Sequence, residues 1–423
     1  NGISVFLDVV YNHIGPEGNY LPKFGPYFQS KYKTPWGDAL NFDGDWSDEV
    51  RHYFLQNARQ WLEEFHFDGL RLDAVHAIFD TSARPFLEDL TRLKKEIEAQ
   101  RKIPLHLIAE SEANDSRILM PYEEGGLALD GQWADDLHHV VHTLTTGEHD
   151  GYYSDYGKLE QLATAYQDGV VFHGEFSEAR HRSHGRRYDK IERTRLVVCS
   201  QNHDQIGNRM KGERLLTLTN FEKQKLAAAC VLLSPGLPLL FMGEEFAETA
   251  PFLYFIDHTD KDLLEAVRKG RKEEFKGFGW KEEPPDPGAV ETFEACKLNW
   301  KSAATDPLAQ EAKTFYKKLI EASKWIRTSG VLEDGRVKAK ADNDRKVVEV
   351  CGENSQDFLQ LFISFSDQEQ KVSVPKRAGG LEILINTSDT KGSLEQVTSS
   401  PAQGELTLKP YSVIALRSRR VME

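Results

Sequence analysis

Apolar residues in the first two thirds of the chain form short continuous runs, and these alternate with longer stretches of helical period. The runs have the length of strands and are apolar on both faces, which is typical of a parallel sheet covered by helices. Six strands are predicted, at residues 3–10, 70–73, 105–110, 130–133, 196–200 and 238–242. Helices are predicted between them, at 48–65 (with Ser47 as its N-cap), 83–100, 136–146, 158–166 and 221–233.

After about residue 326 the pattern changes, and apolar residues recur at every second position in short segments separated by turn residues. Such segments are typical of an antiparallel β-sandwich. They are predicted at 346–351, 358–365, 370–374, 381–385 and 405–416. The sequence therefore predicts an α/β domain at residues 1–327, with a polar insertion at about 249–299, and an all-β sandwich at residues 328–423.

Two parallel folds are compatible with the strand and helix pattern, a (β/α)₈ TIM barrel and an open doubly wound sheet. Polar residues follow several predicted strands: Asn12-His13, Asp73, Glu110 and His203-Asp204. In a barrel these strand ends converge on one mouth, where catalytic groups lie. A doubly wound nucleotide fold would carry a glycine-rich phosphate turn after a strand, and the sequence has no such motif. We therefore expect the barrel.

Composition and charge narrow the range of partners. The 423 residues include 53 Lys and Arg against 67 Asp and Glu, a formal net charge of −14. An acidic chain repels phosphate groups, so neither nucleic acid nor an anionic membrane surface is an expected partner. No apolar run approaches the length of a membrane span. The four cysteines are scattered without metal or redox spacing, which fits free thiols and a cytoplasmic location.

Three of the strand-end residues are carboxylates: Asp73, Glu110 and Asp204. A pair of carboxyl groups, one ionised and one protonated, is what cleavage of a glycosidic bond requires. The alternative is that each acid caps the helix that follows its strand. Because the three residues are far apart in the sequence, only the fold can show whether they share one site or cap separate helices.

The segments around these acids resemble the four shared motifs of the α-amylase superfamily, glycoside hydrolase family 13. The motifs read DVVYNH at 8–13, GLRLDAVH at 69–76, IAE at 108–110 and QNHD at 201–204, in the order of the family. The resemblance extends over nearly the whole chain. It implies a catalytic barrel followed by a C-terminal sandwich, and a retaining α-glycoside hydrolase that uses no cofactor and no catalytic metal.

The resemblance also implies roles for individual residues. Asp73 matches the catalytic nucleophile, Glu110 the general acid/base, and Asp204 the third acid, which holds sugar hydroxyls and stabilises the transition state. Arg71 matches the arginine that keeps the nucleophile ionised and oriented. The remaining matches are expected to bind substrate: His13 and His203 at the cleavage subsite, and His76 on the leaving side.

Aromatic residues and a histidine cluster add further candidates. Trp133, at the end of a predicted strand, is the strongest candidate for stacking on a sugar ring. Three histidines, at 138, 139 and 142, lie within one helical turn, but no acidic or cysteine partner has zinc spacing. Asn12 occupies a place that binds structural calcium in many amylases. The closer resemblance described next argues against calcium here.

Within the superfamily, the segments at 127–153, 200–209 and 239–258 resemble the malto-oligosyltrehalose trehalohydrolases. This resemblance implies hydrolysis of the α-1,4 bond next to the terminal trehalose of malto-oligosyltrehalose, with release of trehalose. It implies a pathway partner, malto-oligosyltrehalose synthase, which makes the substrate. Three alternatives stay open: a glucan branching enzyme with the same catalytic residues, another hydrolase of the α-amylase superfamily, and a catalytically dead sugar-binding barrel.

The first residues, NGISVFLDVV, have the pattern of a buried strand. In the α-amylase superfamily the motif that residues 8–13 resemble lies on the third barrel strand, and a closed barrel needs eight strands. We therefore expect strands three to eight in this chain, with two earlier strands and any N-terminal domain absent. On this expectation, residues 1–423 alone would aggregate or show negligible hydrolysis.

Overall fold

The computed structural model describes residues 2–34, 36–276, 283–333, 335–375, 377, 380–389 and 404–419. The chain divides into two compact units. Unit one consists of Asn1–Ala134, Phe172–Glu175 and Ser183–Val197, and unit two of Asp135–Val171, Phe176–Arg182 and Val198–Glu423. The boundary that the sequence predicts at residues 327 and 328 stays a prediction.

One six-stranded sheet contains all six strands predicted for the barrel, in the order β1-β4-β5-β6-β9-β10. The strands are β1 (Phe6–Val9), β4 (Gly69–Leu72), β5 (His106–Ala109), β6 (Gly131–Trp133), β9 (Leu196–Cys199) and β10 (Leu237–Leu239). From β1 to β9 every neighbouring pair is parallel. The prediction of a partial (β/α)₈ barrel is therefore confirmed.

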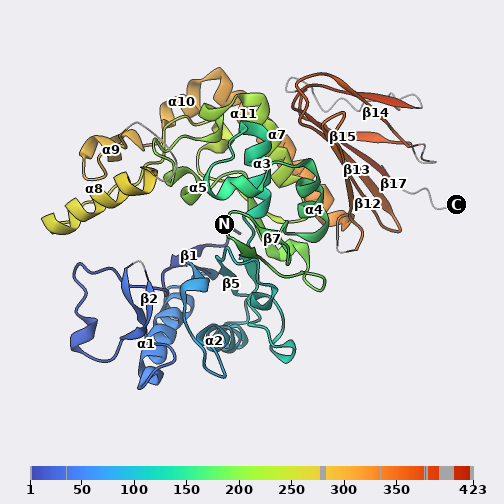
Figure 1. Cartoon of the computed structure of the whole chain (residues 1–423). Coiled ribbons are helices and arrows are strands. Elements are labelled where there is room, and N and C mark those ends of the chain that lie inside the picture. The colour runs from blue at the N-terminus through green and yellow to red at the C-terminus, as the bar shows by residue number, and fades with distance from the viewer. Residues whose placement is uncertain are drawn as a thin grey trace. The chain divides into compact units, whose positions relative to one another are not determined.

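Helices connect these strands close to the predicted positions (Figure 1). Their bounds are α1 Ser47–Arg59, α2 Phe86–Arg101, α3 Asp136–Thr146, α4 Leu159–Asp168, α5 His203–Gly207, α6 Leu215–Leu218, α7 Phe221–Leu232, α8 Lys261–Lys276, α9 Val290–Ala295, α10 Trp300–Thr305 and α11 Pro307–Ser329. The predicted N-cap was wrong: Ser47 is the first residue of α1, and Trp46, in a left-handed conformation, occupies the cap position without a side-chain hydrogen bond. A single π-turn (Gln60–Glu64) extends α1.

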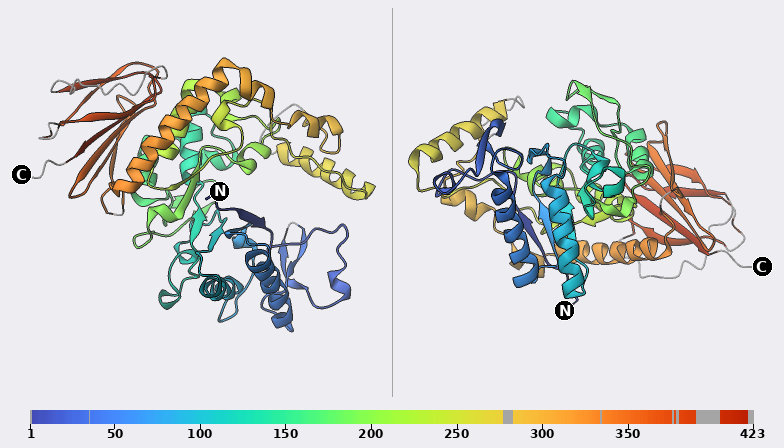
Figure 2. Two further views of the ribbon diagram at one scale, coloured as in Figure 1. Left: turned by 180° about the vertical axis from the view of Figure 1, so that it is seen from behind. Right: turned by 90° about the horizontal axis from the view of Figure 1, so that it is seen from below.

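In unit one, α1 and α2 lie side by side (Figure 2). Rings between them form one buried cluster: Phe42 stacks on Phe86 at 4.5 Å, and Phe54 contacts both rings. Tyr11 joins this cluster through edge contacts with Phe54 and Phe86, and its hydroxyl donates to the Asn57 side chain at 2.8 Å. The chain just after β1 is therefore held by the core, which fixes the position of the polar residues that follow.

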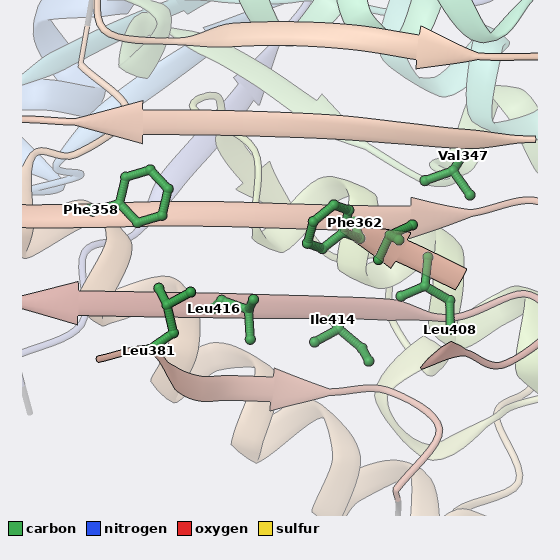
Figure 3. Close-up of a cluster of buried hydrophobic side chains, with 8 residues drawn as sticks. Val347, Phe358, Phe362, Leu381, Leu408, Ile414 and Leu416 are labelled. Atoms are coloured by element: carbon green, nitrogen blue, oxygen red, sulfur yellow. The ribbon is translucent and has the colours of Figure 1, made fainter. Parts of the chain in front are cut away.

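In unit two, the C-terminal segment forms a five-stranded antiparallel sheet, β11-β12-β13-β17-β15, and a two-stranded sheet, β14-β16. The strands are β11 (Lys338–Asp342), β12 (Val347–Glu353), β13 (Asp357–Ser364), β14 (Gln370–Ser373), β15 (Glu382–Asn386), β16 (Glu405–Leu408) and β17 (Val413–Arg419). Val372 and Leu408 from the small sheet belong to one buried hydrophobic cluster with Phe358, Phe362 and Leu416 of the large one (Figure 3). The predicted all-β domain is confirmed.

The prediction of one strand at 405–416 was wrong, because the chain turns between β16 and β17. Pro410 has no N–H to donate, and Tyr411 takes a left-handed conformation with φ 48°. The Ser412 hydroxyl donates to the carbonyl of Lys409 at 2.7 Å and closes this turn. The two halves of the predicted strand therefore belong to different sheets.

Other elements were not predicted. The hairpin of β2 (Phe28–Thr34) and β3 (Gly37–Leu40) follows β1, and the short strands β7 (Phe176–Ser177) and β8 (Arg182–Ser183) come after α4. The polar insertion at 249–299 contains α8 and α9, and its residues 277–282 lie outside the described part of the chain. Across the described ranges, no helix has the length and apolar character needed to cross a membrane.

Gly69, the first residue of β4, offers a test of this packing. A Cβ atom there would clash with the carbonyl oxygen of His106 on β5 and with the ring of Phe6 on β1. We expect Gly69→Ala to lower the free energy of unfolding by about 1–3 kcal/mol, measured by urea denaturation. The control is Gly270→Ala in α8, where the added methyl group meets no neighbour and should stabilise by up to about 1 kcal/mol. Equal stability of Gly69→Ala and the unmodified protein would contradict the tight fit.

Candidate active site

Two predicted acids lie next to each other at the carboxyl edge of the sheet in unit one. Asp73 follows β4 and Glu110 follows β5, and Leu72 and Ala109 are partners in the parallel register. The ladder continues past both strands, because the Glu110 amide donates to the carbonyl of Leu72 at 2.9 Å. The pairing of two parallel strands therefore brings together side chains that are 37 residues apart in the sequence.

Arg71 is the centre of this group of charges. Its side chain is 8% exposed, and its Nη1 donates to Asp73 Oδ1 and to Asp8 Oδ1, both at 2.7 Å. Its Nη2 lies 3.0 Å from Glu110 Oε2, an ion-pair contact without hydrogen-bond geometry. Burial acts to lower the pKa of Arg71, but the charges of Glu110, Asp8 and Asp73 outweigh it and raise the pKa. One permanent positive charge thus faces three carboxylates.

Trp133, the last residue of β6, lies against the guanidinium of Arg71, with 4.4 Å between the Arg71 Cζ and the ring centroid. A cation over a tryptophan face is attracted by the ring quadrupole, by about 0.5–2 kcal/mol. The ring therefore helps to fix the plane of the guanidinium. The expected contact of Trp133 with a sugar stays a prediction.

Two backbone amides that follow Asp73 donate hydrogen bonds to Glu110. The Ala74 amide donates to Glu110 Oε2 at 2.7 Å, and the Val75 amide donates to the Glu110 carbonyl at 3.0 Å. Ala74 adopts a left-handed conformation with φ 38°, which costs a residue with a Cβ about 1–3 kcal/mol. This strained turn orients one carboxylate oxygen of Glu110.

Asn12 and His13 support the other side of Asp73. The Asn12 side-chain amide donates to both the carbonyl and Oδ2 of Asp73 at 2.8 Å. Its oxygen therefore faces His13 Nδ1, 2.5 Å away, and accepts a hydrogen bond from it. Burial lowers the pKa of His13, although the charge of Asp73 opposes this effect. The His13 ring stacks on Trp36 from the β2–β3 hairpin, with centroids 3.7 Å apart and planes at 8°.

His76 is exposed and borders a cavity of about 410 Å³ in unit one. Ser111, the residue after Glu110, lines the same cavity, as do Asp115 and Arg117. The Arg117 guanidinium pairs with the Asp115 carboxylate at 2.5 Å. The cavity therefore begins within three residues of both strand-end acids and presents charged and hydroxyl groups.

Asp204 and His203 belong to unit two, where they form the first turn of α5. His203 Nε2 lies 3.4 Å from Asp204 Oδ2. The helix cap is the buried Asn202, whose Oδ1 accepts from the amides of Asp204 and Gln205 at 3.0 and 2.9 Å. Asp204 is therefore not an N-cap. Asp73 does not cap the turn that follows it either, because Ala74 holds that place.

The residue before Asn202 is anchored by a buried acid. Gln201 Nε2 donates to Glu244 Oε2 at 3.2 Å, and the Gln201 oxygen accepts from the Leu215 amide at 3.1 Å. The Tyr316 hydroxyl lies 3.4 Å from Glu244 Oε1. Burial raises the pKa of Glu244 to about 7.

Sequence reasoning missed several of these contacts. Asp8 is the register partner of Arg71 across β1 and β4, and a pattern of apolar residues does not specify register. Glu244 lies in a predicted strand-end segment, but nothing local marks it as buried.

No group of three or more histidine, cysteine or acidic side chains in the described ranges is arranged to hold a metal ion.

Comparison with known proteins identifies the family. The malto-oligosyltrehalose trehalohydrolase of Brevibacterium helvolum is 37% identical to this chain over 432 residues, which cover 99% of the chain and 68% of that protein. The chain belongs to the malto-oligosyltrehalose trehalohydrolase family. The family member from Saccharolobus solfataricus is 46% identical over 323 residues, which cover 76% of this chain and 54% of that protein. No family model matches the chain.

A solved structure supports the fold assignment for this trehalohydrolase-family chain. The crystal structure of a putative α-amylase from Salmonella typhimurium matches with a TM-score of 0.84 at 34% identity, covering 99% of this chain and 68% of that one. The fold is thus of the α-amylase type. The chain spans about half to two thirds of the length of the curated family members that it matches.

The pKa of Glu244 predicts a pH dependence of stability. In the folded protein Glu244 keeps its proton up to about pH 7, whereas in the unfolded chain it loses it near 4.5. The contribution of Glu244 to the free energy of unfolding is therefore fully present below pH 4.5. It is lost as the pH rises through 7, and the loss is roughly 3 kcal/mol at most. Glu244→Gln should remove this loss, so that the variant gains stability relative to the unmodified protein between pH 5 and pH 8 in urea denaturation.

The control for this experiment is Glu321→Gln, which alters an exposed carboxylate on α11. It should leave the pH dependence of stability unchanged. Parallel stability profiles for Glu244→Gln and the unmodified protein would contradict the buried, protonated state.

Proposed function

We propose that this protein is a retaining α-glycoside hydrolase that cleaves the α-1,4 bond next to the terminal trehalose of malto-oligosyltrehalose and releases trehalose. The observation that carries the reaction type is the contact of one buried guanidinium, Arg71, with both Asp73 and Glu110. The substrate rests on membership of the trehalohydrolase family. We further propose a cytoplasmic location and a malto-oligosyltrehalose synthase as the pathway partner that supplies the substrate.

In the first chemical step, Asp73 Oδ attacks the anomeric carbon of the glucose next to trehalose, and the bond to the trehalose oxygen breaks. The carboxylate of Asp73 accepts one hydrogen bond from Arg71 and one from the Asn12 side-chain amide, and these two contacts would hold it in place for this attack. Glu110 donates its proton to the departing oxygen. The products of this step are trehalose and a covalent ester between Asp73 and the remaining glucan chain.

In the second step, Glu110 removes a proton from water, and the water oxygen attacks the same anomeric carbon. The ester to Asp73 breaks, and the glucan leaves with the original α configuration. Two carboxyl groups in a retaining enzyme lie about 5–5.5 Å apart. Contact of Asp73 and Glu110 with neighbouring nitrogens of one guanidinium supports such a short separation.

Other residues are proposed to bind sugar. His13 and His203 would hold hydroxyls at the cleavage subsite, and Asp204 would hold hydroxyls of the distorted ring. The cavity beside His76 would receive the leaving sugar, because Ser111, the residue after Glu110, lines it and its lining mixes apolar and hydrogen-bonding groups. Trp133 would stack on a sugar with the ring face that Arg71 does not cover.

Product analysis tests the substrate assignment. Maltotriosyl-trehalose should give trehalose and maltotriose as the first products, measured by chromatography at low conversion. Maltopentaose should be cleaved far more slowly, since it lacks the trehalose unit. New α-1,6 branches after incubation with amylose would point to a branching enzyme instead, and glucose or maltose as first product would remove the trehalohydrolase assignment.

Arg71→Lys tests the proposed geometry of the catalytic pair. A lysine ammonium cannot reproduce the planar fork that places Nη1 on Asp73 and Nη2 beside Glu110, so kcat should fall on the order of 10²-fold. Arg59→Lys on α1 is the control, because Arg59 forms ion pairs with Glu63 and Glu96, which are not among these acids. Steady-state kinetics in which both variants keep unmodified kcat would contradict a role for the guanidinium.

Glu110→Gln tests the acid role. A glutamine cannot donate a proton to the leaving oxygen, so turnover of the natural substrate should fall by about 10²–10⁴-fold. An aryl glycoside with a good leaving group needs no such proton, and its burst of aryl alcohol should be much less affected. Equal losses on both substrates would argue against Glu110 as the acid.

A further inference from the structure

The three histidines of α3 lie in unit two. One of them, His138, contacts the segment that carries His203 and Asp204, and a second, His142, is linked to that segment through Glu148. His138 is 2% exposed. Its Nδ1 lies 2.7 Å from the carbonyl oxygen of Ser200, and its Nε2 lies 3.0 Å from the Tyr153 hydroxyl. A carbonyl only accepts, so Nδ1 carries the proton and Nε2 accepts from the tyrosine. Burial holds the pKa of His138 well below its usual value and keeps this ring neutral.

His142 lies one helical turn after His138 and begins a second connection. Its Nε2 donates to Glu148 Oε2 at 2.7 Å. The same carboxylate accepts two hydrogen bonds from Arg209, at 2.7 and 2.9 Å. Burial acts to raise the pKa of Glu148, but these hydrogen bonds and charges lower it to about 2. Glu148 is therefore a carboxylate that links α3 to Arg209.

The two connections hold opposite ends of one segment. Ser200 directly follows β9, and Arg209 follows the end of α5 by two residues. Between them lie Asn202, which caps α5, and the pair His203 and Asp204. Tyr153 joins the connections, because its hydroxyl contacts His138 and its ring stacks on His142 with centroids 4.3 Å apart and planes at 13°.

We propose that His138, together with the His142–Glu148–Arg209 connection, forms a histidine clamp that positions Asp204. The clamp is defined as His138, His142, Glu148 and Arg209. Its members act through the backbone of the segment and not on the sugar, so they are positioning residues. The proposal rests on the proposed function, in which Asp204 holds the distorted ring.

The ring nitrogens of the clamp are already used within the protein. Both nitrogens of His138 take part in hydrogen bonds, and His142 Nε2 is directed at Glu148. These rings are therefore turned toward protein groups and do not converge on a common point, as ligands of a metal ion must. On this proposal, the histidine-rich stretch of α3 holds the backbone that directly follows β9.

The chain offers a matched control. His139 is buried on the same helix, and its ring stacks on Tyr156 at 4.9 Å. His138→Phe removes the hydrogen bond to Ser200, whereas His139→Phe alters a ring of the same size in the same core. Both variants should lose stability, because both change a buried ring.

The first test compares kcat, KM and Tm of His138→Phe and His139→Phe on maltotriosyl-trehalose, well below the Tm of each. We expect kcat to fall roughly 10- to 100-fold in His138→Phe, because a displacement of about 1 Å at a reacting group has an effect of that size. His139→Phe should keep kcat within about twofold. Equal kcat values in the two variants, at any Tm, would overturn the clamp.

The second test asks whether His138 acts through Asp204. In an Asp204→Asn background, adding His138→Phe should cost less than threefold in kcat/KM, since residues acting as one unit are not additive. His138→Asn keeps a donor at the position of Nδ1 and should recover more kcat than His138→Gln, which does not. Independent, multiplying losses, or equal activity of the asparagine and glutamine variants, would refute positioning of Asp204.

Measurements on two substrates, maltotriosyl-trehalose and amylose, distinguish failure of the histidine clamp from failure of the proposed function. If the unmodified protein hydrolyses amylose but does not release trehalose from maltotriosyl-trehalose, the proposed function fails. The same comparison of His138→Phe with His139→Phe, made on amylose, then still supports or overturns the clamp.

Discussion

The buried guanidinium of Arg71 is the interaction on which the arrangement in unit one depends. Three carboxylates, from Asp8, Asp73 and Glu110, face this single charge. Without it, the like charges of the three acids would repel one another, and a guanidinium without them would be costly to bury. The other local features fit this constraint: Trp133 lies against the guanidinium, and parallel register places Asp8 opposite Arg71.

The segment in unit two that carries Asp204 is supported in a different way. Its first part is held by two groups whose neutral form burial favours, His138 and Glu244. Its far end, at Arg209, is held by an ion pair with Glu148. Neutral hydrogen-bonding groups fix the backbone without adding net charge beside Asp204, whose own charge is proposed to matter. The acids in unit one are instead held by the positive charge of Arg71.

Much of the fold follows from the sequence, because a buried parallel strand needs an apolar run, and six such runs are present. The nearness of Asp73 and Glu110 also follows, since each comes directly after one of two neighbouring parallel strands. Register, turns and long-range partners do not. Asp8 as the partner of Arg71 depends on register, the break at Pro410 was hidden in a continuous alternating pattern, and His138 and Ser200 are 62 residues apart.

The central claim is that Arg71 presents Asp73 to the anomeric carbon as a nucleophile. The most direct measurement is rapid chemical quench of the protein during turnover of maltotriosyl-trehalose, followed by proteolysis and mass spectrometry of the peptides. The account predicts a maltotriosyl ester on the peptide that contains Asp73, located at that side chain by fragmentation, together with maltotriose released in the α configuration. An adduct on another residue, or a product of inverted configuration with no adduct, would contradict it.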